Sequence, residues 1–152
     1  MKASSASSKR TPKAAAARSA PPVQPYTSLH FAVGIHGLQG SGAVEVVLPT
    51  AQIVELPRRV RSVQFGPLAL RRGLTDSTEW FDWWRTARRL PLVKRLVTVV
   101  LLKPDGAEAV RWLFPDCVPV GYAVTPLSAI LGSTVIETLE LKVGDFQLFR
   151  RE

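Results

Sequence analysis

The sequence has little cysteine, little histidine and no long apolar run. One cysteine among 152 residues excludes an intrachain disulfide framework and a CxxC metal site. No stretch approaches the roughly 20 apolar residues that a membrane-spanning helix needs, so we expect no membrane insertion of the free chain. Two histidines without an acidic cluster beside them make a poor metal site. These absences favour a soluble protein that is held together by a hydrophobic core.

The first 28 residues contain no acidic residue and a single aromatic one, Tyr26. They are mainly Ala, Ser, Pro and basic residues, and they hold +5 of the formal net charge of +8. Such a segment has too little apolar surface to offset the entropy lost on ordering. We therefore predict a flexible, disordered basic extension over residues 1–28. A single, only mildly basic domain is expected over residues 29–152.

The domain shows the apolar alternation of short β-strands. In residues 29–35, Leu29, Phe31, Val33 and Ile35 share one face. Further extended segments are predicted at 43–48, 51–56, 63–70, 95–102, 109–114, 118–124 and 135–143. Seven or eight strands of this kind predict a mainly β fold, an antiparallel β-barrel or sandwich.

One helix interrupts the strands, over residues 77–89. Asp76 and Glu79 have the spacing of a capping-box-like start. Trp80, Trp83 and Trp84 lie at positions i, i+3 and i+4, which predicts a buried aromatic stripe. The fold class expected is therefore a barrel or sandwich with one flanking α-helix.

The residues do not assemble into a catalytic site. Cys117 has only His30 and His36 as conceivable bases, and a structural buried thiol is the simpler interpretation. The glycines within residues 37–42 have the reverse of the dinucleotide-binding spacing, with no helix after them. We predict no enzyme, no metal and no cofactor.

One acidic residue lies where a charge is costly. In residues 134–143, Glu137 shares a strand face with apolar side chains. A carboxylate in such a row needs a partner unless it reaches solvent at the strand end. A salt-bridge partner would be Arg71, Arg72 or an arginine of a neighbouring subunit, and the last is our hypothesis.

Four segments of the chain, in order, resemble the inner-tube protein family of contractile phage tails and extracellular contractile injection systems. They are LHFAVGIHGLQGSGAVEV (29–46), LALRRGLTDSTEWFDWW (68–84), KRLVTVVLLKPDGAEAVRWLF (94–114) and STVIETLELKVGDF (133–146). The second is the most specific, because Arg72, Gly73 and Leu74 match the family signature directly. Four motifs in the right order and spacing make coincidence improbable.

The resemblance implies a tail-tube fold whose subunits form hexameric rings that stack into a hollow tube. It implies a structural role, with sheath, baseplate and spike proteins as partners and with DNA or protein cargo in the lumen. Because the basic extension has no secretory apolar region, we expect assembly in the cytoplasm and later release in a virion or extracellular particle. A phage tail and an injection system both stay open.

Several stretches depart from the family pattern, and the one that concerns stacking follows the second strand. The family has a long loop there, which extends to contact the next ring, whereas the corresponding region of this chain, residues 47–49 and then 55–59, is short. This departure indicates altered stacking. A bulk tube subunit and a tube-initiating subunit at the baseplate are both compatible with it.

A small basic β-barrel that binds nucleic acid is the alternative function. Its surface would be formed by Arg58, Arg59, Arg61, Arg71 and Arg72. Only Phe65 lies among them to stack on a base, which is weak for that function. The arginines at 58, 59, 71 and 72 fit a lumen or a subunit interface as well, so they join Glu137 as predicted interface residues.

Overall fold

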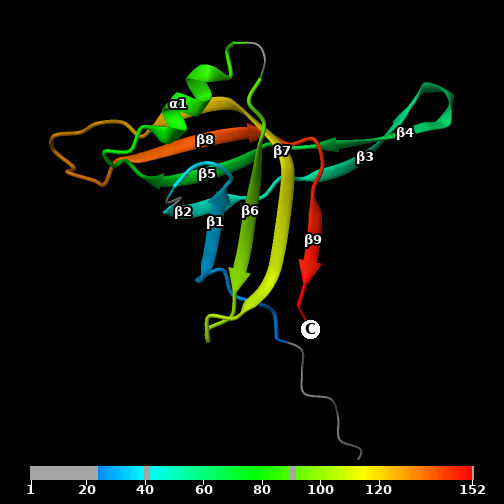
Figure 1. The fold of residues 1–152 in the computed structure, drawn as a ribbon, viewed down its shortest axis with the longest axis horizontal. Helices are drawn as coiled ribbons and strands as arrows, with labels where there is room; N and C mark the ends of the chain where they lie inside the picture. Colours follow the sequence, from blue (N-terminus) through cyan, green and yellow to red (C-terminus); the bar gives the residue numbers. More distant parts are fainter. Residues whose placement is uncertain (1–23, 40–41, 90–91, 152) are drawn as a thin grey trace, which may run out of the picture.

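A computed structural model describes residues 24–39, 42–89 and 92–151 of the chain (Figure 1). The strands are β1 (Phe31–Ile35), β2 (Ala43–Val47), β3 (Ala51–Leu56), β4 (Val60–Phe65), β5 (Leu68–Gly73), β6 (Arg95–Leu102), β7 (Glu108–Val124), β8 (Ile136–Lys142) and β9 (Gln147–Arg150). The helix is α1 (Glu79–Thr86). Most of the predicted extension, residues 1–23, lies outside the described part. Within that part, no helix is long and apolar enough to cross a membrane.

The main sheet has seven strands in the order β1-β6-β7-β8-β5-β2, with β9 beside β7. Each of its described pairings is antiparallel. Figure 1 shows β1, β6 and the first part of β7 running across the direction of β8 and β5. The predicted mainly β fold with one flanking helix is confirmed.

Strand β7 joins the two halves of this sheet. Its residues from Glu108 to Cys117 pair with β6, and Val118–Val124 pair with β8. Pro115 and Pro119 flank the point of exchange, and prolines have no N–H group to donate to a ladder. The two strands predicted at 109–114 and 118–124 are therefore one long strand that changes its partner.

Helix α1 is shorter than the predicted range of 77–89. Its N-cap is Thr78, which makes no side-chain capping bond, so the predicted capping box with Asp76 is wrong. The aromatic stripe is confirmed, because Trp80 and Trp83 are buried and Trp84 is half-buried. The indole Nε1 of Trp83 also donates to the carbonyl of Val93 at 3.0 Å.

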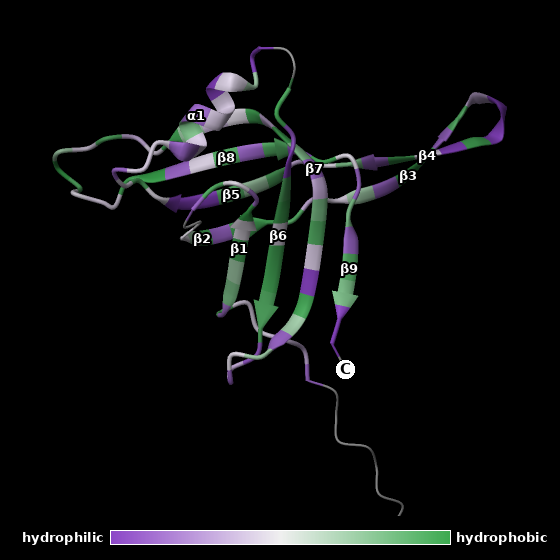
Figure 2. Cartoon of the chain, in the orientation of Figure 1, coloured by the Kyte–Doolittle hydropathy of each residue, from purple (hydrophilic) through white to green (hydrophobic). Residues whose placement is uncertain are grey.

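The core lies between the helix and the two halves of the sheet. It consists of Val33, Ile35, Leu68, Leu70, Trp80, Trp83, Val97, Val99, Phe114, Cys117, Leu139, Leu141 and Val143. Figure 2 shows β6 hydrophobic along most of its length. Only one face of β6 is fully buried within the chain, because Val97 and Val99 point inward while Leu96 on the other face is 38% exposed.

The predicted strand at 63–70 is in fact two strands, β4 and β5. Gly66 and Pro67 separate them, consistent with the poor ladder geometry of both residue types. Strands β3 and β4 form a separate two-stranded sheet, which projects from the main body (Figure 1). The stretch that we expected to be a shortened loop is therefore the turn of a projecting hairpin. Strand β9 was not predicted.

Candidate functional site

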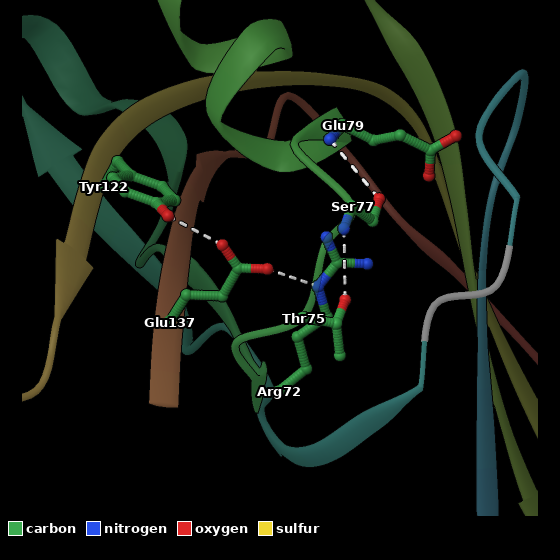
Figure 3. A network of polar contacts seen from close by, with 6 residues as sticks. All are labelled: Arg72, Thr75, Ser77, Glu79, Tyr122 and Glu137. Atoms are coloured by element: carbon green, nitrogen blue, oxygen red, sulfur yellow. Dashed lines mark hydrogen bonds and ion pairs between the residues drawn. The ribbon is translucent and has the colours of Figure 1, made fainter. Parts of the chain in front are cut away.

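The ion pair between Arg72 and Glu137 is buried inside the sheet. Arg72 on β5 lies directly opposite Glu137 on β8, and its Nε donates to Glu137 Oε1. The two side chains are 5% and 1% exposed. Figure 3 shows the guanidinium and the carboxylate facing each other beneath the start of α1. Two opposite charges held in low-dielectric surroundings attract strongly, which offsets part of their desolvation cost.

Two aromatic side chains complete this buried cluster. The hydroxyl of Tyr122 on β7 donates to Glu137 Oε2 at 2.7 Å (Figure 3). Burial raises the pKa of Tyr122 to about 12, and its hydrogen bond to the Glu137 carboxylate adds to the rise. The guanidinium carbon of Arg72 lies 4.1 Å from the centre of the Trp80 ring, a cation–π contact. The cluster thus connects β5, β7, β8 and α1.

The partner of Glu137 comes from its own chain. Of the three candidates, our hypothesis was an arginine of a neighbouring subunit, and it is wrong, because Arg72 of the same chain pairs with Glu137. Both carboxylate oxygens of Glu137 are already engaged, so its burial needs no arginine from another subunit. The interface roles assigned to the five residues stay predictions. Because the side chains of Glu137 and Arg72 are buried, they could influence an interface only through the residues that cover them.

Arg71 points to the opposite side of β5. Its Nη1 donates to Glu45 Oε2 at 2.8 Å, and the two side chains are 36% and 52% exposed. Glu45 and Arg71 are register partners between β2 and β5. An exposed pair of this kind contributes at most about 1 kcal/mol to stability. It leaves Arg71 at the surface near β2, where a contact with another chain is sterically open.

Arg58 and Arg59 form the tip of the projecting hairpin. Their φ angles are 71° and 59°, in the left-handed region that L-residues rarely adopt. The Nη2 atom of the next arginine, Arg61, lies 3.8 Å from Glu55 Oε1 across the ladder, and both side chains are well exposed. Figure 2 shows a hydrophilic tip on an arm of mixed character. The arm also carries Ile53, which is 66% exposed.

A shallow apolar groove lies between the two ends of the main sheet. Among the described strands, β1 pairs with β6 alone and β2 pairs with β5 alone, so each has an unpaired edge. The groove has a volume of about 370 Å³, and its lining includes Phe31, Val46, Val99 and Trp112. Unpaired strand edges offer backbone donors and acceptors to another chain.

The remaining chemistry of the described residues is sparse. Burial raises the pKa of the Cys117 thiol to about 12, and the Asp116 carboxylate adds to the rise, so the thiolate is disfavoured. Both histidines, His30 and His36, are exposed. No group of three or more His, Cys, Asp or Glu side chains in the described residues is placed to hold a metal ion.

Two contacts of the ion pair were not predicted from the sequence, those with Tyr122 and with Trp80. Trp80 was predicted to be buried, but its contact with Arg72 depends on how α1 packs against the sheet. Tyr122 belongs to a strand whose pairing with β8 cannot be derived from local alternation. The signal available in the sequence was Glu137 itself, a charge in an apolar row.

A family profile described as "T4-like virus tail tube protein gp19" matches residues 54–147. This span runs from β3 to the start of β9, so it includes the hairpin tip, α1 and the buried ion pair. A comparison with curated protein sequences gives no match.

Several solved structures have a similar fold. A chain in the cryo-EM structure of the anti-feeding prophage (AFP) baseplate is 21% identical with a TM-score of 0.60, covering 87% of this chain and 97% of that one. A chain of the PVC extracellular contractile injection system sheath–tube complex in the extended state is 16% identical with a TM-score of 0.66, covering 84% of this chain and 93% of that one. Hcp1 from Flavobacterium johnsoniae is 16% identical with a TM-score of 0.60, covering 80% of this chain and 98% of that one. At these identities the likeness shows the fold.

Proposed function

The chain belongs to the T4-like virus tail tube protein family, and from this premise we propose that six copies form a ring and that rings stack into a tube. The protein is a structural subunit of the inner tube of a contractile tail-like particle. The observation that carries the proposal is the family match over residues 54–147, which takes in the hairpin, the helix and the ion pair. The particle is a virion or an extracellular injection particle, and we propose that its subunits assemble in the cytoplasm.

The exposed apolar residues support assembly. Leu127, Ile130 and Leu131, in the loop between β7 and β8, are 79%, 95% and 76% exposed. Val44 on the edge strand β2 is 60% exposed. Large apolar side chains gathered at the surface of a single chain mark contact sites for other chains. A closed ring uses heterologous contacts, in which two different patches of the subunit meet.

We propose a sheath, a baseplate and a spike as the other partners in the particle. The names of two similar structures, a baseplate and a sheath–tube complex, support this proposal. Passage of DNA or of protein cargo through the lumen stays a prediction. Within this proposal the subunit has two alternative roles: it initiates the tube at the baseplate, or it forms the bulk of the tube.

No specific observation favours the nucleic-acid-binding alternative. Of the five arginines predicted to form its surface, Arg61, Arg71 and Arg72 face carboxylates of the same chain. Arg72 is also buried, so it is not available to a phosphate. The arginines therefore do not form one continuous basic surface for a nucleic acid strand.

Negative-stain microscopy and sedimentation of the purified full chain test the proposal. We expect six-fold rings, and tubes if the subunit stacks on itself. Ile130→Asp should weaken ring formation, because it places a charge at a contact, whereas Ser133→Asp in the same exposed loop is the matched control. Rings without tubes would favour the initiating role. A monomer at every concentration, with the baseplate and sheath proteins present, would contradict the proposal.

A further inference from the structure

The C-terminal end of α1 carries an arginine cluster, which we define as Arg85, Arg88 and Arg89. Each of the three is exposed. Arg85 lies in the last turn of α1, whereas Arg88 and Arg89 lie in the turn that follows, where their backbone N–H groups donate to the carbonyls of Arg85 and Thr86. Trp80 and Trp83 anchor the helix in the core, and the three exposed arginines gather at its C-terminal end.

The cluster encloses a small hollow of its own. The hollow has a volume of about 270 Å³ and is lined by the three arginines together with Thr86. The Thr86 hydroxyl already donates to the carbonyl of Trp83 at 2.8 Å. The groups left to receive a ligand are therefore guanidinium groups, which suit planar anions such as carboxylates.

The charges of the cluster are not neutralised within the described part of the chain. No ion pair or side-chain hydrogen bond there joins a carboxylate to Arg85, Arg88 or Arg89. Three like charges gathered around one hollow repel one another. The negative end of the helix dipole offsets part of that repulsion, and a bound anion would offset the rest.

Among the described residues no carboxylate pairs with the cluster, so an anion bound there would come from another molecule. Four carboxylates of the described chain, those of Glu45, Glu55, Glu108 and Glu137, already face arginines. The three guanidinium groups gather positive charge around one hollow, and a carboxylate-rich surface is complementary to it. A partner of opposite charge therefore fits the cluster.

The aromatic surroundings separate an acidic protein from a nucleic acid. The ring of Trp84 lies beside the cluster, with the guanidinium carbon of Arg88 5.5 Å from its centre. Phe81 and Tyr122 pack against the same ring, at centroid distances of 5.9 and 6.2 Å. Trp84 thus has neighbours on several sides and offers no open platform for a stacked base, which single-strand binding uses.

We propose that the arginine cluster is a docking site for a carboxylate-rich segment of an acidic partner protein. The contact is made by guanidinium–carboxylate pairs at the outer end of α1. It lies at the C-terminal end of α1 and in the turn that follows, apart in sequence from the β3–β4 hairpin and from the exposed loop between β7 and β8. The site goes beyond the proposed tube function and does not require the chain to form rings.

Fluorescence anisotropy with a labelled polyglutamate peptide tests the site on the full chain. The variant Arg85→Gln/Arg88→Gln/Arg89→Gln should weaken binding about tenfold, because three exposed ion pairs are lost together. The matched control is Arg58→Gln/Arg59→Gln/Arg61→Gln, which removes the same charge from the hairpin. Both variants keep the basic extension, so its contribution to binding cancels in the comparison.

Equal losses in the two variants, or no loss in either, would overturn the proposal. A labelled oligothymidylate provides the second arm of the test. If it bound more tightly than the peptide and were released by the same three substitutions, the site would be one for nucleic acid and the proposal would be wrong. Microscopy of the same samples shows whether rings form, and this result tests the tube function independently of the docking site.

Discussion

Glu137 lies directly opposite Arg72 in the ladder between β5 and β8, and the two charges pair where almost no solvent reaches them. Removing one charge of such a pair leaves the other buried without compensation. The net attraction of the pair therefore contributes less to stability than the cost of the unpaired buried charge that the loss of either partner would leave. Its position beneath α1 makes it sensitive to the docking of the helix on the sheet (Figure 3).

Glu137→Gln should lower the free energy of unfolding by about 3–5 kcal/mol, because the Arg72 guanidinium then has no countercharge in the interior. Urea unfolding of the isolated chain measures this change. Tyr122→Phe is the graded control, since it removes a single hydrogen bond to the same carboxylate and should cost about 1.5–3 kcal/mol. Unchanged stability and assembly in Glu137→Gln would show that the pair has no structural role.

The environment of Tyr122 predicts a loss of stability at high pH. Its pKa in the folded chain is about 12, above the ordinary value of 10, so the folded state holds the phenol proton more tightly than the unfolded state does. The stabilisation is complete below pH 10 and is lost as the pH rises through 12. Tyr26→Phe leaves Tyr122 as the single tyrosine of the chain. Ultraviolet titration of tyrosinate in that variant should give a midpoint well above 10, and a midpoint at 10 would contradict the structure.

Much of the fold could be predicted because local patterns determine it. The alternation in residues 31–35 and the tryptophan spacing on α1 report which side of each element is buried, and the structure confirms both. The predicted face also included Leu29, which is wrong, because Leu29 lies outside β1 and is 79% exposed. The length of β7 could not be predicted, because Pro115 and Pro119 look like strand ends locally. They lie where the strand exchanges β6 for β8, and that exchange depends on distant parts of the chain.

The candidate site shows the same division. A charge in an apolar row was enough to predict that Glu137 needs a partner. Choosing between Arg71 and Arg72 requires the register, because adjacent residues of a strand point to opposite faces. The ladder places Arg72 opposite Glu137 and leaves Arg71 with Glu45. Registers between distant strands come from the packing of the whole sheet, so no local pattern contains them.

The tip of the hairpin should be more stable with residues that suit its backbone. Arg58 and Arg59 both have positive φ, a backbone region that Asn and Gly adopt with less strain than arginine does. Arg58→Asn/Arg59→Gly should therefore raise the free energy of unfolding by about 1 kcal/mol. Thermal unfolding measures the gain. Arg61→Asn, at an exposed strand position without positive φ, is the control and should give none. A loss of stability in the double variant would show that the arginines make contacts at the tip that compensate for its strain.

The projecting hairpin should have one face that matters for stacking. Ile53 and Val63 are register partners on the same face of the arm, and they are 66% and 54% exposed. If the arm contacts the next ring, as the resemblance implies, Ile53→Asp/Val63→Asp should prevent tubes and leave single rings, because two carboxylates would be buried in an apolar contact. Electron microscopy and sedimentation distinguish the two states. The control is Gln52→Asp/Gln64→Asp, which adds the same charges to an exposed register pair on the other face. Tubes that persist in the first variant, or that disappear equally in both, would show that this face is not the one that contacts the next ring.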